Sequence, residues 1–320
     1  MKDKNCNCTI VILTYKGLHH LEYLLPTVKT AIANSPPYRF NTLIIDNGCH
    51  EPTKQFANKN FPEFDYLFSP VNDYLFSLND FVAQIKTEFV FILNDDMRLE
   101  ADVLNKTMEI IEKDKTLFAV SCKIRDWDDT YTASGIRKLE IQKGWMKSFY
   151  ADADETQLQY ILYGGGGAAV FRTTIYNKLK GFDPLYRPAY CEDTDLGHRA
   201  WHLGYKTIYH PQAVLFHREG GTIKDQFKAD KLDQNIGKNQ ILWMVRNGNA
   251  RYFLLSFLLL LPYRLLLGWR INKNQYIALF KSLPKIPLAL FKRISDPVPV
   301  LRDEELITYL GRVYENKSAQ

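Results

Sequence analysis

The chain has 320 residues, of which 46% are hydrophobic, and its formal net charge at pH 7 is +5. This length and composition indicate a globular protein of one large domain, with or without an appendage. Its five cysteines lack paired C-x-x-C spacing, which argues against a zinc site or a disulfide framework and favours a reducing cytosol. The apolar stretch after Thr9 is too short for a signal-peptide core, so we expect nothing here to send the chain across a membrane.

Short β-rich segments alternate with helical patterns through the first half of the chain. The helical patterns at residues 18–34 and 101–115 repeat apolar residues every three or four positions, as helices that cover a sheet do. This alternation predicts a Rossmann-like α/β fold with a parallel sheet. The predicted strands cover residues 8–15, 40–48, 64–70, 88–96 and 117–124.

Polar residues follow three of these strands. They are Thr14 and Tyr15 after the first, Asp46 and Asn47 after the second, and Asn94, Asp95 and Asp96 after the fourth. In open α/β sheets ligands bind outside the carboxyl ends of the strands, so we expect these side chains at a ligand-binding rim. The same acids would also suit the cap of a following helix, and the pattern alone leaves both interpretations open.

The alternation weakens after about residue 125. We expect residues 125–155 to form an irregular, mobile or acceptor-facing insertion. The four glycines at 164–167 lack the Lys and Ser/Thr of a phosphate-binding P-loop. They fit a backbone that approaches a ligand closely, and they fit a tightly packed strand equally well.

A second polar cluster opens a predicted helix with Glu192, Asp193 and Asp195. Acids stabilise a helix N-terminus electrostatically, which would explain them without any catalytic role. A carboxylate beside another can also have its pKa raised toward the working pH of a general base. His217 ends a short apolar strand further on, and together with Asp96 it would form an oxygen and nitrogen ligand set for Mn²⁺ or Mg²⁺.

The C-terminal segment is apolar and basic. The run from Tyr252 to Trp269 contains Pro262 and Arg264, whereas a spanning helix needs roughly 20 apolar residues with few charges. We therefore expect it to lie on a membrane or in a core. Between Asp233 and Asp296 there are ten Lys and Arg residues and no acid, which suggests an anionic partner. Packing on the rest of the chain, or against a second copy in a homo-oligomer, is the alternative.

Several segments in a fixed order resemble the inverting family 2 glycosyltransferases of the GT-A fold, especially the bacterial branch that builds rhamnan, O-antigen and related surface glycans. They are GGGGAAVFR, GFDPLY, YCEDTDLGHRAW and GYKTIYHPQAVLFH. The resemblance spans roughly residues 8–250. It implies an α/β, Rossmann-like GT-A fold with a mostly parallel central sheet and a C-terminal helical appendage. The catalytic domain would cover residues 1–240, with a nucleotide-sugar half at about 1–125 and an acceptor half at about 126–240, and the appendage would cover 241–320.

The resemblance also implies roles for the residues at the predicted rim. Asp46 would contact the nucleotide base, and Thr14 and Tyr15 would line the same pocket. The D-x-D element of the family is matched by Asn94, Asp95 and Asp96, with Asp96 in the place of the metal-binding acid. Asn94 stands where many members have Asp, so His217, in the family's downstream ligand position, becomes more important for the metal.

Asp193 matches the catalytic base of the family, and Glu192 matches an acid that orients the acceptor or donor. The chain would then transfer a sugar from a UDP- or dTDP-sugar to a glycan or polyprenyl-linked glycan, with Mn²⁺ or Mg²⁺ as cofactor. We expect a cytoplasmic enzyme, peripheral at the inner face of the cytoplasmic membrane, with no nucleic-acid partner.

Two other functions remain open from the residues alone. A nucleotidyltransferase would share the sheet, the acids and the metal, but its glycine-rich basic loop is not matched by LTYKGLHH after the first strand. A non-catalytic scaffold at the membrane surface would not require Asp96, Asp193 and His217.

Overall fold

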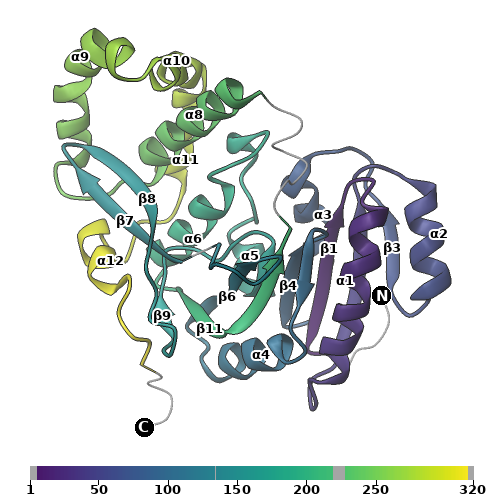
Figure 1. The fold of residues 1–320 in the computed structure, drawn as a ribbon. Helices are drawn as coiled ribbons and strands as arrows, with labels where there is room; N and C mark the ends of the chain where they lie inside the picture. The colour runs from purple at the N-terminus through teal and green to yellow at the C-terminus, as the bar shows by residue number, and fades with distance from the viewer. Residues whose placement is uncertain (1–5, 134, 219–227, 316–320) are drawn as a thin grey trace.

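The computed structural model describes residues 6–133, 135–218 and 228–315, and these form an α/β protein around one curled sheet (Figure 1). The strands are β1 Cys8–Thr14, β2 Phe40–Asp46, β3 Asp65–Phe68, β4 Phe89–Asn94, β5 Met97–Leu99, β6 Leu117–Asp126, β7 Ile136–Gln142, β8 Trp145–Ala151, β9 Gln159–Tyr160, β10 Ala168–Arg172 and β11 Lys206–His217. The α-helices are α1 Leu18–Ala33, α2 Glu51–Asn60, α3 Leu78–Val82, α4 Val103–Lys113, α5 Thr173–Lys178, α6 Glu192–His202, α8 Ala229–Asn247, α9 Phe253–Ile271, α10 Lys273–Ser282, α11 Ile286–Ser295 and α12 Asp303–Tyr309.

The central sheet is largely parallel. Its order is β3-β2-β1-β4-β10-β6-β11-β5, with β9 paired to β11. The first four strands run parallel, as does the β6–β11 pair, whereas β10 runs antiparallel between β4 and β6. Strand β1 is almost entirely buried, as expected for a central strand covered on both faces. The predicted fold class is confirmed, with strands close to the predicted bounds.

The short strand β5 links two distant parts of the sheet. It follows β4 directly in the chain, yet it pairs antiparallel with the end of β11, where His217 lies opposite Met97. Three strands lie between β4 and β5 in the sheet order. The turn at residues 95–96 therefore bridges two parts of the sheet and brings the end of β4 to the end of β11.

Residues 136–151 form a β-hairpin of β7 and β8, so the prediction of an irregular insertion is wrong for this segment. Lys143 and Gly144, at its tip, both have positive φ, 50° and 65°, which is the backbone of a type I′ turn. Lys at the first central position of that turn is not one of its usual residues, so the hairpin has no local sequence signal. The hairpin packs its tip on α9, since a Cβ atom on Gly144 would lie 2.4 Å from the Phe257 nitrogen.

The C-terminal helices gather at the end of the molecule far from α1 and α2 (Figure 1). Helix α8 is their centre and packs on α10, α11 and α6. The domain boundary expected at residue 240 falls inside this continuous helix. No helix among the described residues combines the length and the apolar character needed to cross a bilayer.

Candidate active site

Thr14 and Asp95 join the loops that follow β1 and β4. The two strands are neighbours, with Leu13 opposite Asn94. The Thr14 hydroxyl donates to Asp95 Oδ2 at 2.5 Å, and it accepts from the Gly17 amide at 3.2 Å. Burial raises the pKa of Asp95 to about 7, although the Thr14 hydrogen bond opposes this. Through Thr14, Asp95 in the loop after β4 thus holds the start of α1 in place.

Asp46 shapes the loop that follows β2. Its side chain is fully buried, and Oδ1 accepts from the Gly48 amide at 2.7 Å. Oδ2 accepts from the His50 amide at 2.7 Å and from the Tyr66 hydroxyl at 2.8 Å. The carboxylate is therefore occupied within the protein, and direct contact between Asp46 and a nucleotide base requires this loop to rearrange.

Asp96 and His217 meet as the sequence predicted. His217 Nε2 lies 3.2 Å from Asp96 Oδ2, because the β5–β11 pairing sets the two residues at the same edge. The other oxygen, Asp96 Oδ1, is buried and has no hydrogen-bond partner among the described residues. An unpartnered buried carboxylate oxygen is costly, so this atom marks a place for a bound cation or donor. His20 of α1 lines the same small pocket as Asp95 and Asp96.

The glycine run connects this rim with the second cluster. A Cβ atom on Gly167 would lie 2.3 Å from the Asn94 side chain, and one on Gly165 would lie 3.2 Å from Arg137 Nη2. Consecutive Cα atoms are about 3.8 Å apart, so Asn94 and Arg137 pack on backbone positions within about 8 Å of each other. The absence of Cβ atoms at these glycines therefore lets Asn94 and Arg137 pack closely on the backbone between the two clusters.

The turn before α6 holds Glu192 and Asp193 in a strained arrangement. Tyr190 and Cys191 both adopt left-handed φ, 73° and 72°, which costs on the order of 1–3 kcal/mol each for residues other than glycine. The buried Asn239 side chain of α8 clamps this turn by donating to the carbonyls of Ala189 and Tyr190, each at 2.9 Å. Strain that is held in place in this way is typical of functional sites.

Burial raises the pKa values of both acids. The pKa of Glu192 reaches about 8, because its side chain is buried and the Asp193 charge lies beside it. Glu192 Oε2 has no hydrogen-bond partner among the described residues. Burial also raises the pKa of Asp193, while the Arg137 guanidinium and the Thr194 amide, which donates at 2.7 Å, oppose the rise. Asp193 keeps part of its surface exposed.

Arg137 of β7 is a site residue that the sequence did not reveal. It is buried, and its guanidinium carbon lies 5.0 Å from the ring centroid of Tyr163 and 5.5 Å from that of Tyr150. Its Nη1 donates to Ser121 at 3.0 Å. A basic residue in a segment without recognised structure carried no signal of this placement.

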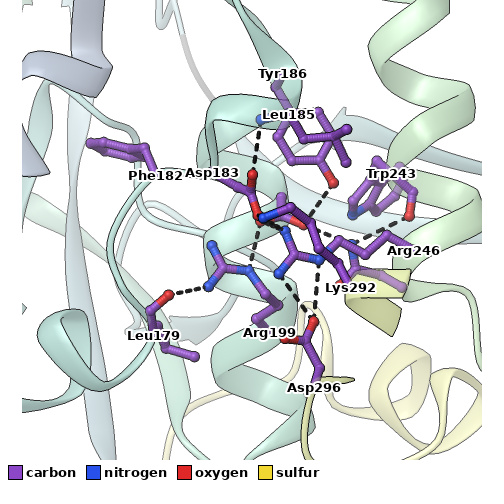
Figure 2. Close-up of polar contacts among 12 residues, drawn as sticks. Leu179, Phe182, Asp183, Leu185, Tyr186, Arg199, Trp243, Arg246, Lys292 and Asp296 are labelled. Atoms are coloured by element: carbon purple, nitrogen blue, oxygen red, sulfur yellow. Dashed lines mark hydrogen bonds and ion pairs between the residues drawn. The ribbon is translucent and has the colours of Figure 1, made fainter. Parts of the chain in front are cut away.

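Asp195 belongs to a buried ionic network between α6 and α8. It accepts from Arg199 Nε at 2.6 Å, from the Tyr186 hydroxyl at 2.7 Å and from Asn247 at 2.8 Å. Figure 2 shows Tyr186, Arg199 and Arg246 converging at this point, with Arg246 also paired to Asp183. Although burial opposes ionisation, these partners lower the pKa of Asp195 to about 2. The network fixes α6 to α8, so Asp195 supports the site without taking part in it.

A second His and Asp cluster lies on the buried side of α6. His198, His202 and Asp303 are buried, with potential ligand atoms within 4.8 Å of one another. His198 Nε2 lies 2.8 Å from Asp303 Oδ1, and Asp303 Oδ2 accepts from the amides of Asn249 and Ala250. These contacts hold the start of α12 against α6, so the cluster has a structural role.

Residues 9–180, more than half of the chain, match the sequence model described as glycosyl transferase family 2. The chain belongs to this family. A related protein, N-acetylglucosaminyl-diphospho-decaprenol L-rhamnosyltransferase of Mycobacterium tuberculosis, is 24% identical over 243 residues, covering 68% of this chain and 78% of the relative. Family 2 membership makes the protein a glycosyltransferase.

Solved structures share the fold. The crystal structure of GalNAc-T7 with UDP, GalNAc and Mn²⁺ has a TM-score of 0.60 at 14% identity, covering 93% of this chain. This chain spans only 59% of the GalNAc-T7 chain. The structure of S. aureus TarS 1–349 with UDP-GlcNAc has a TM-score of 0.58 at 14% identity, covering 91% of this chain and 88% of the TarS chain. The curled, largely parallel sheet is that of GT-A glycosyltransferases.

Proposed function

We propose that this family 2 enzyme is an inverting, metal-assisted glycosyltransferase of bacterial surface-polysaccharide synthesis. It takes a sugar from a UDP- or dTDP-sugar and transfers it to a hydroxyl of a glycan or polyprenyl-linked glycan. The observation that carries the proposal is the meeting of Asp96 and His217 at the carboxyl ends of the strands. The Mn²⁺ and UDP in GalNAc-T7 and the acceptor named for the mycobacterial relative support it.

The oxygen and nitrogen atoms of Asp96 and His217 are suitable ligands for a divalent ion. One Asp96 oxygen faces the His217 ring at 3.2 Å, and the other is buried without a partner in the described chain. Oxygen and imidazole nitrogen ligands suit Mn²⁺ and Mg²⁺ and leave positions for phosphate oxygens. Such an ion, when bound, supplies charge neutralisation for the departing diphosphate.

Asp193 acts as the general base. The acceptor oxygen forms a bond to the anomeric carbon while its proton passes to the Asp193 carboxylate. The bond from the anomeric carbon to the diphosphate oxygen breaks, and its electron pair leaves on the nucleoside diphosphate. Attack from the face opposite the diphosphate inverts the anomeric centre. Burial brings the pKa of Asp193 closer to the working pH, and Arg137 keeps the ionised form available.

Glu192 orients a sugar as a neutral acid. With a pKa of about 8 it carries a proton at neutral pH, and its Oε2 atom has no partner within the described chain. A protonated carboxyl group can donate one hydrogen bond and accept others, which suits a sugar hydroxyl. Its position beside Asp193 places this contact next to the proton transfer.

The nucleotide lies against the loops at the ends of β1 and β2. Thr14 and Tyr15 border this place on one side. Asp46 contributes by holding the backbone of residues 47–50 in its loop conformation. Asn94 and Asp95 fix the neighbouring loop, Asn94 through its packing on Gly167 and Asp95 through Thr14.

The C-terminal helices bring the enzyme to the inner face of the cytoplasmic membrane. Several large apolar side chains of α9 and α11 are exposed, among them Leu259 at 69%, Leu266 at 74%, Phe291 at 65% and Ile294 at 82%. The segment from 234 to 295 that carries them contains ten basic residues and no acid. Exposed apolar side chains in a basic segment suit an anionic bilayer surface, where a polyprenyl-linked acceptor is found.

The proposal is tested with a panel of UDP-, dTDP- and GDP-sugars, each with and without Mn²⁺. Thermal unfolding reports binding, because a ligand of the folded state raises the unfolding temperature. We expect at least one UDP- or dTDP-sugar to raise this temperature only when Mn²⁺ is present, and to be slowly cleaved to the nucleoside diphosphate. Stabilisation that is identical with and without Mn²⁺ would contradict the metal assignment.

A further inference from the structure

Helix α6 carries two histidines that meet Asp303, the first residue of α12. His198 and His202 are four positions apart, which places them on the same face of the helix, and their ring centroids lie 4.3 Å apart. His198 Nε2 lies 2.8 Å from Asp303 Oδ1, and His202 Nε2 lies 3.5 Å from the same oxygen. Two imidazole nitrogens and one carboxylate oxygen, from parts of the chain about a hundred residues apart, are thus brought together.

The cluster is closed to solvent except at His202. The side chains of His198 and Asp303 are 0% exposed, and that of His202 is 11% exposed. Among the described residues, the basic side chains within 4.0 Å of the Asp303 carboxylate are these two histidines. Buried carboxylates in proteins are paired with a cation or coordinate a metal ion.

Hydrogen bonds alone leave this cluster incompletely satisfied. The contact of His198 with Asp303 at 2.8 Å is an ordinary hydrogen bond, whereas that of His202 at 3.5 Å exceeds the usual range of roughly 2.7–3.2 Å. A bound ion is one explanation for poorly satisfied buried polar atoms. A cation between the three side chains uses Nε2 of both rings at once, and the proton of each neutral ring then lies on Nδ1.

Backbone groups hold the Asp303 carboxylate in a fixed orientation. Its Oδ2 atom accepts from the amide of Asn249 at 2.7 Å and from that of Ala250 at 3.2 Å. The Asp303 amide donates to Asn249 Oδ1 at 2.7 Å. Oδ1 is therefore left directed toward the histidines. Hydrogen bonds that orient a ligand in this way are a regular feature of metal sites.

The ligand types and spacing favour zinc. Zn²⁺ binds imidazole nitrogen and carboxylate oxygen at about 2.0–2.2 Å, and a tetrahedral site with such bonds separates its ligand atoms by about 3.3 Å, between the two separations observed. Mg²⁺ and Mn²⁺ prefer sets richer in oxygen. An iron(II) site with the same ligands keeps open positions for its substrates, which burial disfavours. Cysteine takes no part, so the lack of C-x-x-C pairs does not bear on this site.

We propose that His198, His202 and Asp303 form a structural Zn²⁺ site, with a water molecule as fourth ligand on the partly exposed side of His202. The ion joins α6, the residues that follow α8, and the start of α12. Because α6 begins with Glu192 and Asp193, the ion also stabilises the helix that carries the proposed base. The inference requires neither the sugar donor nor the acceptor, so it stands apart from the proposed function.

Direct measurement of zinc tests the site. The full chain with Asp96→Ala and His217→Ala is used, so that the proposed Mn²⁺ site does not contribute. After a chelator has removed bound metal, we expect calorimetry and elemental analysis to give one Zn²⁺ per chain, bound at least ~10-fold more tightly than Mn²⁺. Zn²⁺ should also raise the unfolding temperature, because it binds the folded state. A chain that binds no zinc, or binds Mn²⁺ equally well, overturns the proposal.

Further variants on this double-variant parent locate the ion. His202→Gln and Asp303→Asn keep much of the size and polarity of the side chains, and each should weaken Zn²⁺ at least ~10-fold through loss of a ligand. His210→Gln is the matched control, since His210 is a buried histidine of β11 outside the cluster. Unchanged affinity in the first two variants, or equal weakening by His210→Gln, overturns the assignment.

A spectroscopic measurement on the same parent needs none of these further substitutions. Co²⁺ in place of Zn²⁺ absorbs visible light strongly when it is four-coordinate and weakly when it is six-coordinate. We expect the strong absorption at one equivalent of Co²⁺, and its loss when Zn²⁺ is added, because the two ions compete for one site. Weak absorption throughout the titration would contradict the tetrahedral site.

Discussion

Asp96 and His217 are 121 positions apart in the sequence, and their side chains lie 3.2 Å apart, because β5 crosses from the end of β4 to the end of β11. We expect Asp96→Ala and His217→Ala each to weaken Mn²⁺-dependent binding of UDP or dTDP by at least ~10-fold, since even residues that only support metal ligands cost that much. Calorimetry with and without Mn²⁺ measures this. Asp80→Ala, at an exposed acid of α3, is the control. Unchanged Mn²⁺-dependent binding in both variants would show that the two residues do not bind the metal.

Arg137 should set the pH dependence of transfer. Its positive charge favours the ionised form of Asp193, so Arg137→Gln raises the pKa of that carboxyl group. The acid limb of kcat/KM, where the rate rises as the base loses its proton, then moves to higher pH. The variant should lose most activity at low pH and recover it at high pH, and Arg137→Lys should shift the limb less. Lys147→Gln on the exposed side of the hairpin is the control, and a pH profile of unchanged shape in Arg137→Gln would contradict the role.

Glu192 should make the protein less stable as pH rises. The pKa of this acid is about 8 in the folded protein and near 4.3 in an unfolded chain. The folded state therefore binds the proton more tightly, and the free energy of unfolding falls between these two pH values. Glu192→Gln should match the wild type at about pH 4 and exceed its unfolding temperature increasingly toward pH 8. Glu22→Gln, at an exposed acid of α1, should show no such trend.

The membrane surface is tested by co-sedimentation with vesicles. We expect the protein to sediment with anionic vesicles and added salt to weaken this, since about 1 kcal/mol per basic residue near the surface comes from screened charge. A Leu266→Ser/Ile294→Ser variant should sediment less, whereas Val71→Ser, at an exposed apolar residue of the catalytic domain, should not. Truncation at residue 240 is a poor test, because it cuts α8. Equal sedimentation with neutral and anionic vesicles would contradict the electrostatic contribution to membrane binding. If the protein sediments with neither kind of vesicle, these helices serve only to pack within the protein.

The sequence predicted the five strands between residues 8 and 124 and the polar residues at their ends, because both have local signals. Apolar runs such as residues 89–93 end in polar residues where the strand ends. It did not reveal which carboxylates face the site. Glu192, Asp193 and Asp195 share one helical turn, but positions 193 and 195 point about 200° apart on a helix. Which of these two acids faces the site and which is structural depends on how α6 packs against α8. The hairpin and Arg137 depend on long-range packing of β7 against Tyr163 and the glycine run, which no local pattern encodes.

The Asp193→Asn variant, assayed at saturating sugar nucleotide, tests the general-base role most directly. This substitution keeps the shape of the side chain and removes the proton acceptor. Donor affinity, measured by calorimetry with Mn²⁺, should stay within about twofold, while transfer to a diphosphate-linked acceptor falls at least ~10²-fold. Transfer at the wild-type rate by a variant that binds donor normally would contradict the account, because the proton of the acceptor would then leave by a route that does not involve Asp193.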